Sequence, residues 1–414
     1  MSTTDLPSLA DPAVQLCPFA AYSRLRDEAP VFRDPVTRHW IVTRFEDVKA
    51  IASDWERFSN ANNEFEAGRQ GAPGQDAIRK LYEEHDYVPV RTLIGTDPPI
   101  HRWHRAAVNT AFSTPRVRAM DSYIEQMVNE AIDRFAAKGE TDFVAEFAIP
   151  LPMSVIADQL GVPRDMSDTF KRWSDAMMTA ANVGNPPDVQ LDAARTILEM
   201  REFLLAEIRK LYVTPRDCIL SDIASAVGED GALLPEPERL TIASQILVAG
   251  NETTTSTLGH AMLRMISSPG LEDKLRAEPS LIPPFVEECL RLDAPLQGLV
   301  RRATQDVELH GMTIRANDIV LLRWGAANRD ERRFACPDTL DLSRADPRGH
   351  MTFGHGIHFC PGRELARAEV KIAFQQLLKR LKNFRLAEGD DNVQFQPSYI
   401  AYGPSRVHIR FDAA

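Results

Sequence analysis

The feature that most constrains the fold is one unusually long helical stretch. Residues 237 to about 267 carry a helical pattern that corresponds to roughly 45 Å at 1.5 Å per residue. A helix of that length would cross a whole domain, so the rest of the chain must pack around it. Its middle is a poor helix sequence, because Gly250 and Asn251 are followed by Glu252 and three threonines. A carboxyl group at the centre of such a helix is costly unless it has a partner or a use.

The remaining pattern is mainly helical with a smaller β region. No linker, repeat or low-complexity tract divides the 414 residues, so we predict one large domain over 1–414. A hairpin is expected around Asp34-Pro35, and a small sheet over residues 307–322. The segment from about 57 to 95 is weakly patterned and is expected to be a long loop. The β-containing parts are placed at about 30–45, 296–325 and 393–412, and the helical bulk at about 97–290 and 363–384.

Charge and cysteine content exclude several classes of protein. The net charge of −11 makes nucleic acid an unfavourable partner. Five scattered cysteines argue against a disulfide framework and for a reducing, cytoplasmic compartment. The N-terminal residues lack the basic and apolar pattern of a signal peptide, and no run of about 18 apolar residues occurs. We therefore expect no membrane anchor.

A glycine-rich loop at 353–362 places Cys360 directly before a second helical pattern. Free N–H groups and the helix dipole stabilise an anion at such a position, so a thiolate there could bind a metal or act as a nucleophile. The glycines would let the backbone approach a flat ligand closely. A zinc site of His355, His358 and Cys360 is a weaker alternative, because no second Cys or His pair stands at a matching spacing. A buried cysteine without chemistry is the remaining alternative.

The loop pattern Phe-x-x-Gly-x-His-x-Cys-x-Gly resembles the haem-binding signature of the cytochrome P450 superfamily. Its fixed residues here are Phe353, Gly356, His358, Cys360 and Gly362. The resemblance implies the predominantly helical P450 fold of the soluble bacterial type, with haem b as cofactor. It implies that the Cys360 thiolate is the axial iron ligand, that Phe353 packs beside the sulfur, and that His358 contacts a haem propionate.

The middle of the long helix resembles the oxygen-activation motif of the same family, Ala/Gly-Gly-x-Asp/Glu-Thr. By that match, Thr253 hydrogen-bonds the bound dioxygen, Glu252 relays protons to it, and Gly250 leaves room for it. A hydroxyl can donate and accept, and a carboxyl can reload its proton from solvent. The alternative is a surface acid on a kinked helix whose threonines bond back to the preceding turn. The intact acid–alcohol pair favours an O₂-dependent monooxygenase over a peroxide-driven haem-thiolate enzyme or a non-catalytic haem sensor.

A Glu-x-x-Arg motif is the third point of resemblance. Glu288 and Arg291 lie on one face of a helix at this spacing and can pair. The resemblance implies a structural role below the haem, with Arg344 as the partner of both residues. Alone, the motif is common and usually marks a solvated ion pair.

Two further groups of cations resemble the propionate-binding residues of the family. His101 and Arg105 stand at i and i+4 and would face the same side of a helix. Arg301 matches the other propionate-binding arginine, and arginine suits carboxylates because it bonds them bidentately. Alternation along a strand lets only one of Arg301 and Arg302 face the haem. Each could instead be an ordinary surface charge.

The substrate region is predicted from the resemblance and from its apolar character. A small or medium hydrophobic molecule is the expected substrate, with one orienting hydrogen bond from Tyr87 or Gln297 unless these two merely pack. The predicted pocket residues are Tyr87, Val90, Ile94, Met177, Val248, Ala249, Gln297, Leu299 and Ile400.

Electrons are expected from a separate protein. The chain has no Gly-x-Gly-x-x-Gly dinucleotide motif and no spare cysteines for an iron–sulfur cluster. A ferredoxin or flavodoxin with an NAD(P)H-dependent reductase is therefore implied. Arg102 and Arg363 are expected to help steer such an acidic partner.

Overall fold

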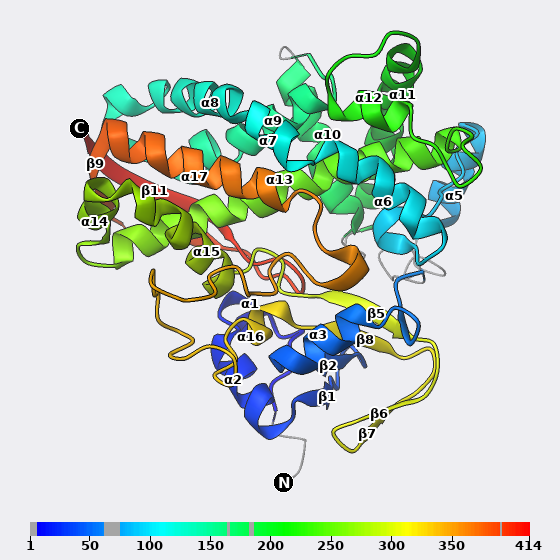
Figure 1. Cartoon of the computed structure of the whole chain (residues 1–414), viewed down its shortest axis with the longest axis horizontal. Coiled ribbons are helices and arrows are strands. Elements are labelled where there is room, and N and C mark those ends of the chain that lie inside the picture. Colours follow the sequence, from blue (N-terminus) through cyan, green and yellow to red (C-terminus); the bar gives the residue numbers. More distant parts are fainter. Residues whose placement is uncertain (1–5, 62–74, 164–165, 182–185, 390) are drawn as a thin grey trace. The chain divides into compact units, whose positions relative to one another are not determined.

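The computed structural model describes residues 6–61, 75–163, 166–181, 186–389 and 391–414 (Figure 1). The described chain packs as two compact units. Unit 1 consists of Met1–Ser59, Met120–Leu151 and Thr253–Ala414, and unit 2 of Asn60–Ala119 and Pro152–Glu252. Neither unit is one continuous stretch of sequence, so this division does not decide whether residues 1–414 fold as one domain, which stays a prediction.

The larger sheet of unit 1 has five strands in the order β1-β2-β8-β5-β3. The predicted hairpin is present, because β1 and β2 pair antiparallel with Val31 opposite Val42. Strand β8 is buried along its whole length and pairs in parallel with β2 and antiparallel with β5. The strands are β1 Val31–Arg33, β2 Trp40–Val42, β3 Phe58–Ser59, β5 Leu299–Ala303 and β8 Ile319–Leu322.

Our prediction of one small sheet over residues 307–322 is wrong in one respect. Strands β6 (Val307–Leu309) and β7 (Met312–Ile314) pair only with each other, whereas β8 belongs to the five-stranded sheet. The reason is composition, because the four apolar residues of β8 need cover on both faces and a two-stranded ribbon cannot supply it.

A third sheet is built around the C-terminal strand of the chain. Strand β11 (Pro404–Ala413) pairs with β10 (Val393–Phe395), β4 (Glu140–Asp142) and β9 (Leu381–Leu386). The predicted C-terminal strand is thus confirmed. The helix expected over 363–384 ends earlier, at Arg380, because Leu381 and Phe384 turn inward as residues of β9.

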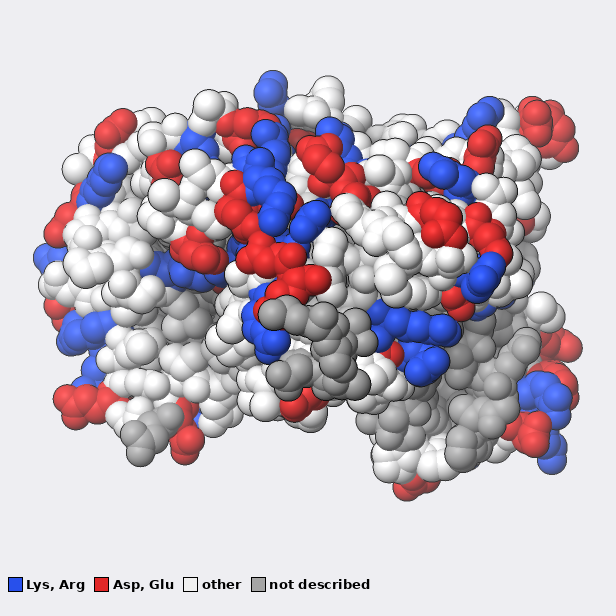
Figure 2. All heavy atoms as spheres, turned by 90° about the horizontal axis from the view of Figure 1, so that it is seen from below, with Lys and Arg blue, Asp and Glu red and all other residues white. Residues whose placement is uncertain are grey.

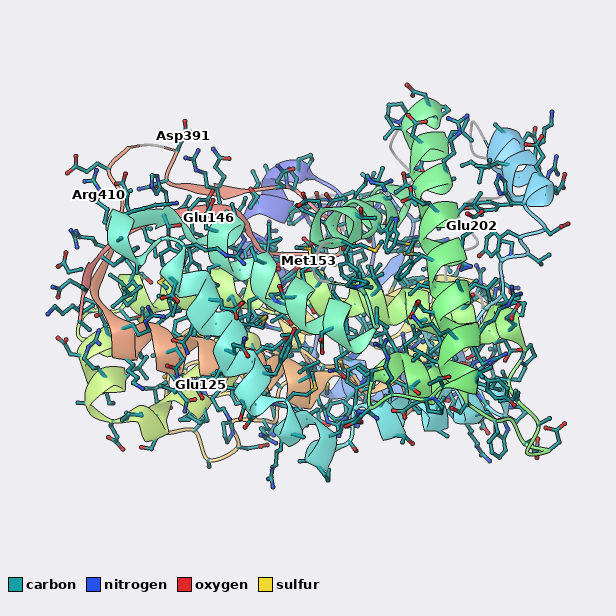
Figure 3. All side chains as sticks on the ribbon, turned by 90° about the horizontal axis from the view of Figure 1, so that it is seen from above. Glu125, Glu146, Met153, Glu202, Asp391 and Arg410 are labelled. Carbon is teal, nitrogen blue, oxygen red and sulfur yellow. The ribbon has the colours of Figure 1, made fainter. Side chains whose placement is uncertain are left out.

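The helices of unit 1 pack on these sheets and on one another. Helices α8 and α17 lie side by side (Figure 1), and Gln376 of α17 donates to Glu125 of α8 at 3.0 Å (Figure 3). The helices and helical turns are α1 Pro12–Leu16, α2 Phe19–Glu28, α3 Phe45–Ser53, α8 Asp121–Asp133, η3 Ala136–Lys138, η4 Val144–Ala148, α14 Leu271–Ala277, η6 Pro279–Leu281, α15 Ile282–Leu292, α16 Trp324–Ala327, η7 Gly356–His358 and α17 Arg363–Arg380.

Unit 2 is helical in its described part and has its own core, built from apolar residues such as Phe170, Trp173 and Leu204. The segment predicted as a long loop contains helix α5, which packs against α11. His85, directly after the end of α5, contacts Glu202 of α11 at 3.5 Å; Figure 3 labels Glu202. Residues 62–74 of that segment lie outside the described residues. The helices and turn are α5 Gln75–Glu84, η2 Leu93–Gly95, α6 Ile100–Ala111, α7 Thr114–Ala119, α10 Ser167–Ala181, α11 Pro187–Val213 and α12 Ile219–Ala224.

Helices α9 (Pro150–Gln159) and α13 (Glu236–Ser267) contribute to both units. Helix α13 confirms the long helix predicted from the sequence, and it runs unbroken through Gly250 and the threonines. Within the described residues, none of the helices combines the length and the apolar character needed to cross a membrane.

Candidate active site

The Cys360 loop of unit 1 is held in a tight backbone conformation. The Cys360 amide donates to the Phe353 carbonyl at 2.9 Å, which closes the loop on itself. Gly354 and Gly356 both adopt positive φ angles, of 72° and 69°. A side chain at Gly356 would also place its Cβ 2.5 Å from the carbonyl oxygen of Ala52, so only glycine fits there.

Cys360 lies two residues before Gly362, the N-cap of α17, and is half-buried. The unpaired N–H groups of the first helical turn favour a negative charge at this position. Arg363 secures the loop, because its guanidinium donates to the Cys360 carbonyl at 2.9 Å and lies 4.7 Å from the centre of the Phe359 ring. The local field and geometry therefore suit a thiolate.

A buried ionic cluster beneath Phe353 was not predicted from the sequence. Arg367 lies 4.6 Å from the centre of the Phe353 ring and donates to Glu287 at 2.6 Å. His350 contacts the same carboxylate at 3.0 Å. Burial alone would raise the pKa of Glu287, but the bonds from His350 and Arg367 outweigh it and lower that pKa. The available signal was Glu287 itself, a second acid directly before the Glu-x-x-Arg motif.

Glu288 is the centre of a second buried cluster in unit 1. Arg291 donates to both of its oxygens, at 2.7 and 2.9 Å, which is the pairing that the i, i+3 spacing predicts. Arg344 donates at 2.9 Å, and the Asp341 amide also donates at 2.9 Å. Burial would raise the pKa of Glu288, yet these donors lower it. Arg291 also donates to the carbonyl of Thr339, so the cluster ties α15 to the chain that leads to the Cys360 loop.

Arg301 and Arg302 of β5 differ in burial, as strand alternation requires. Arg301 is buried, whereas Arg302 is half-buried and donates to the Asn317 carbonyl at 2.9 Å. Arg301 is therefore the inward-facing cation of the two. His358 ends the turn η7 and is half-buried.

In unit 2, helix α6 carries His101 and Arg105 one turn apart, as predicted. His101 is 3 % exposed and Arg105 is half-buried. Arg105 donates through Nε to the Asn109 side chain at 2.8 Å, which holds its stem along the helix.

The part of α13 that belongs to unit 2 ends in the predicted acid. A methyl group on Gly250 would meet Ile156 at 3.7 Å, an ordinary contact, so packing on this side does not demand glycine. Asn251 donates to Ser174 of α10 at 3.1 Å, which fixes α13 against α10 at this point. Glu252 is exposed, yet desolvation by the surrounding protein raises its pKa; the nearby Asp175 raises it further and Lys171 opposes both. Glu252 therefore holds a proton at a higher pH than an ordinary glutamate does.

In unit 1, the threonines that follow have different partners. Thr255 donates to the carbonyl of Ala148 at 3.0 Å. Thr254 hydrogen-bonds Glu369 of α17, a residue that sequence reasoning did not select. Burial raises the pKa of Glu369 to about 8, against which the Thr254 bond is a smaller, opposing effect. The signal was an acid on the apolar face of α17, between Leu365 and Ile372.

Glu369→Gln is expected to remove a pH dependence of stability. Because the folded pKa is raised, the folded state holds its proton while the unfolded state releases it, so stability falls as pH rises from about 4.5 to about 8. At pH 8 the cost is on the order of 4 kcal/mol, because the pKa is raised from 4.5 to about 8 and each pKa unit corresponds to about 1.4 kcal/mol. Urea unfolding at pH 5.5 and pH 8 should show that the variant gains much more stability over the wild type at the higher pH than at the lower one. Glu364→Gln, on the same helix but less buried, should show no such gain.

The predicted pocket residues of unit 2 lie partly against its core and partly at its surface. Val248 and Met177 pack against the core of unit 2, whereas Ala249 and Ile94 are exposed. Val90 is half-buried. Tyr87 also packs: its ring meets Tyr82 edge to face at 4.8 Å, and the Arg201 guanidinium lies 4.1 Å from its centre.

In unit 1, the segments that carry Leu299 and Ile400 lie together, because the Gln297 amide donates to the Ile400 carbonyl at 2.7 Å. The structure corrects the prediction that the Gln297 side chain faces the pocket. It is 1 % exposed, accepts from the Tyr22 hydroxyl at 2.9 Å and donates to the Ala294 carbonyl at 2.6 Å. These bonds commit its amide to interior packing, so we leave Gln297 out of the proposed pocket.

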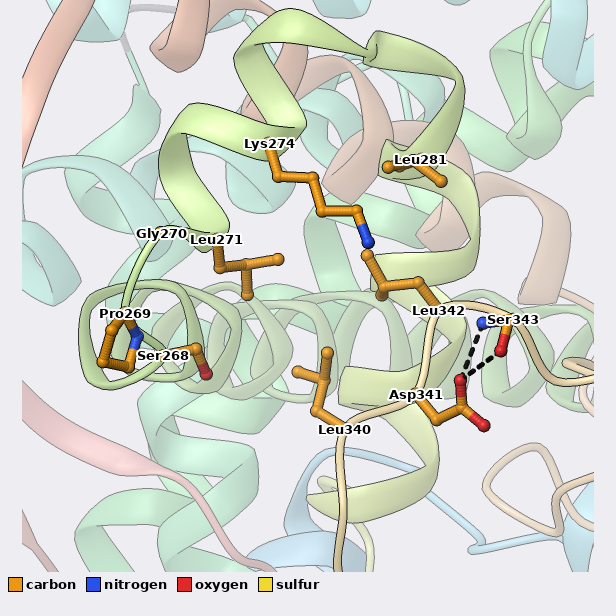
Figure 4. A pocket seen from close by; sticks show the side chains of 10 residues that line it. All are labelled: Ser268, Pro269, Gly270, Leu271, Lys274, Leu281, Leu340, Asp341, Leu342 and Ser343. Carbon is orange, nitrogen blue, oxygen red and sulfur yellow. Dashed lines mark hydrogen bonds between the residues drawn. The ribbon is translucent and has the colours of Figure 1, made fainter.

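A separate surface groove of about 400 Å³ lies in unit 1 beside α14 (Figure 4). Leu271, Leu281 and Leu340 give it apolar walls, and Asp341 at its edge accepts two bonds from Ser343. None of the predicted site residues lines it.

Comparison with known proteins agrees with the geometry of the Cys360 loop. The family model for Cytochrome P450 matches residues 66–410. The chain belongs to the cytochrome P450 family. This confirms the predicted fold class, and it confirms an oxidoreductase of the monooxygenase type at the level of the family.

Several P450 relatives match over nearly the whole chain. Cytochrome P450 107B1 of Saccharopolyspora erythraea is 34 % identical over 99 % of each chain. The 6-deoxyerythronolide B hydroxylase of the same organism is 32 % identical and covers 99 % of this chain and 100 % of its own. The crystal structure of CYP109E1 from Bacillus megaterium in complex with testosterone is 30 % identical, with a TM-score of 0.82 over 95 % of this chain and 99 % of that one.

The P450 family implies a haem, and the residues present fit one. Unit 1 offers a thiol at a helix N-terminus, on a loop whose glycines keep side chains away, together with the buried cation Arg301. Unit 2 offers His101 and Arg105 on one helix. A thiolate suits the iron, and cations suit the two carboxylates of the macrocycle.

The charged surface of this P450 is mixed. In the view of Figure 2, acidic and basic side chains are interleaved, and neither sign forms one continuous field. The chain has 59 acidic and 48 basic residues, and on the face in Figure 2 steering of a charged partner must depend on local groups.

Proposed function

We propose that this P450 is a monooxygenase that inserts one atom of O₂ into a small or medium hydrophobic substrate. The observation that carries the proposal is the acid–alcohol step Glu252-Thr253 within α13, in a chain that also carries the Cys360 loop. A haem protein that only carried or sensed a ligand would not need a proton relay in that helix.

The haem supplies the activation of O₂ when it is bound. Cys360 would bind its iron as a thiolate, and Phe353 would pack beside the sulfur. The Arg367 guanidinium holds the Phe353 ring, at 4.6 Å from its centre. Its carboxylates would be bound by cations: Arg301 and His358 are the candidates in unit 1, and His101 and Arg105 are the candidates in unit 2. Glu288, Arg291 and Arg344 keep the loop that carries the thiolate in place.

Proton delivery is assigned to Glu252 and Thr253. The raised pKa of Glu252 lets its carboxyl hold a proton at a higher pH than an ordinary glutamate and reload it from solvent. The Thr253 hydroxyl can accept that proton and donate another, because it is both donor and acceptor. Asn251, bonded to Ser174, keeps this turn of α13 fixed while protons move.

Thr253→Ala is expected to separate oxygen consumption from product formation. Loss of the hydroxyl removes a general-acid step, so product formation should fall by about a hundredfold, within the usual range of such steps. O₂ uptake should continue, with hydrogen peroxide as the main product. Parallel measurement of O₂, peroxide and product tests this, with Thr257→Ala on the same helix as the control. An equal product yield in both variants would favour a peroxide-driven enzyme.

The substrate is proposed to be a hydrophobic molecule with a ring system. The relatives named above include a hydroxylase of 6-deoxyerythronolide B and a structure that holds testosterone. The candidate wall residues of this chain are also mainly apolar. They are Tyr87, Val90, Ile94, Met177, Val248, Ala249, Leu299 and Ile400.

Electrons are proposed to come from a ferredoxin or flavodoxin with its NAD(P)H-dependent reductase. Arg102 is an exposed cation of α6 and a suitable contact for such an acidic partner. Arg363 is a poor probe, because it also holds the Cys360 carbonyl.

Arg102→Glu is expected to slow reduction by a ferredoxin several-fold at low salt and to leave ligand affinity unchanged. Charge reversal at an exposed position acts mainly on the association rate, and salt should shrink the difference. Stopped-flow reduction at two ionic strengths measures the effect. Arg195→Glu, an exposed arginine of α11 paired with Asp192, is the control. Equal reduction rates in both variants at low salt would remove Arg102 from the docking site.

The absorption spectrum of the dithionite-reduced protein with carbon monoxide is the direct test of the proposed function. A strongly red-shifted Soret band is expected from thiolate ligation, followed by product formation that requires O₂ and an electron donor. Absence of haem, or a band typical of histidine-ligated haem, would overturn the proposal.

A further inference from the structure

The proposed pocket residue Ile94 lies in a tight turn of unit 2 that begins with a strained residue. Leu93 has φ = 40°, a left-handed conformation that is strained for a non-glycine residue. The turn η2 is closed by bonds from the Gly95 amide to the Thr92 carbonyl at 2.9 Å and from the Thr96 hydroxyl to the Leu93 carbonyl at 3.1 Å. Strain of this kind persists only where surrounding groups hold the backbone in place.

Two helices provide those surrounding groups. His104 of α6 accepts the Leu93 amide proton at Nδ1, with a distance of 3.2 Å. Gln245 of α13 donates to the carbonyl of Thr92 at 3.3 Å. The side chain of His104 is fully buried, so this acceptor is held in place by the surrounding protein.

The contacts of His104 define its tautomer. A backbone amide can only donate, so Nδ1 must carry the lone pair and Nε2 the proton. Nε2 then donates to the carboxylate of Glu238 at 2.8 Å. Glu238 lies in the first turn of α13, where the helix N-terminus favours a negative charge. Glu238, His104 and the Leu93 amide therefore form one directed chain of hydrogen bonds.

We propose that His104 and Glu238 are positioning residues that hold the turn Leu93–Gly95 and thereby set the affinity of this P450 for its hydrophobic substrate. The inference rests on the proposed function, because it takes Ile94 as part of the substrate pocket. Glu238 orients the imidazole, and the imidazole holds Leu93 in its left-handed conformation. Without that acceptor the Leu93 amide would lose its side-chain partner, and the turn would relax with Ile94 displaced.

Two substitutions at His104 separate its two bonds. Asparagine can place an oxygen where Nδ1 stands and accept from Leu93, whereas glutamine can reach toward Glu238 but offers no acceptor to Leu93. His104→Gln should speed amide exchange of residues 92–96 and weaken binding of a hydrophobic ligand about tenfold, equivalent to one hydrogen bond of about 1.4 kcal/mol. His104→Asn should restore most of both properties. Hydrogen exchange by mass spectrometry and titration of the Soret shift with testosterone are the readouts.

The kinetic pattern distinguishes positioning from a general loss of structure. His104→Gln should raise KM and leave kcat nearly unchanged, because the turn acts on binding alone. Unchanged exchange at 92–96 in His104→Gln, or an equal loss of affinity in His104→Asn and His104→Gln, would overturn the inference.

If His104→Gln does not fold, substitutions of two glutamates in α13 still test the inference. Glu238 is 26 % exposed, so Glu238→Ala should fold, and it should show the same changes to a lesser degree. Glu236→Ala is the matched control, because Glu236 lies in the same helical turn but pairs with Arg209 at 2.7 Å. Equal exchange and affinity in these two variants would contradict the proposal.

Failure of this inference differs from failure of the proposed function. If the wild-type protein lacks the thiolate-type spectrum or forms no product, the monooxygenase proposal falls, and with it the role of the turn in binding substrate. If the wild-type protein has both and binds testosterone, while none of the variants changes affinity, only the positioning role falls.

Discussion

Cys360→Ser is expected to reduce oxygenation to the background rate of free haem. A serine alcohol stays protonated at neutral pH, so the helix N-terminus at Gly362 has no anion to stabilise and the iron has no thiolate ligand. The loop should keep its shape, because its closing bond from residue 360 to the Phe353 carbonyl uses the backbone amide. The carbon monoxide spectrum should lose the red-shifted Soret band, while the far-ultraviolet circular dichroism stays unchanged.

Cys336→Ser provides the matched control. Cys336 is an exposed cysteine outside the loop, and its removal should alter neither the spectrum nor turnover. Retention of the red-shifted band by Cys360→Ser would show that another residue ligates the iron and would overturn the site as proposed.

Arg291→Met is expected to produce the largest loss of stability. Arg291 and Glu288 are each about 1 % exposed, and the guanidinium donates to both carboxylate oxygens and to the carbonyls of Asn328 and Thr339. Breaking a buried pair by removing one partner typically costs about 3–5 kcal/mol, because the remaining charge is left without compensation. Arg344 still contacts Glu288, so the loss should lie at the lower end of that range. Urea unfolding at neutral pH measures it.

Arg24→Met tests the same substitution at the surface. Arg24 pairs with Glu28 across one helical turn while 46 % exposed, and such pairs contribute about 0.5 kcal/mol or less. A similar loss of stability in both variants would mean that the buried cluster at Glu288 contributes no more to stability than a surface ion pair.

The sequence was sufficient where local pattern decides structure. The helix through Gly250 and Glu252 was predictable because its flanks are strongly helical, and the hairpin at Asp34 because turn residues separate two apolar runs. The pairing of Glu288 with Arg291 follows from helical spacing alone. The Cys360 loop was predictable from its resemblance to a known signature, whereas spacing by itself left zinc open as an alternative.

Long-range packing decided what the sequence did not reveal. Strand β8 joins the five-stranded sheet by pairing with β2, where Trp40 lies opposite Val320. Because these strands are far apart in the sequence, no local pattern indicates the pairing. Gln297 looked like a polar group facing a pocket, and only the fold shows Tyr22 and Ala294 as its partners. Glu369 resembled an ordinary helix acid until burial beside Thr254 set it apart. Burial and remote partners are properties of the packed chain, which single-sequence patterns do not contain.

The parallel pairing of β2 with β8 has a consequence for synthesis of the chain. Trp40 pairs with Val320, so the first hairpin to leave the ribosome waits for a strand 280 residues later. At 5–20 residues per second the delay is roughly 15 to 55 s. During that time Val31, Phe32 and Ile41, all buried in the finished protein, have no sheet to cover them. The N-terminal hairpin of the nascent chain therefore depends on protection from aggregation until β8 has been made.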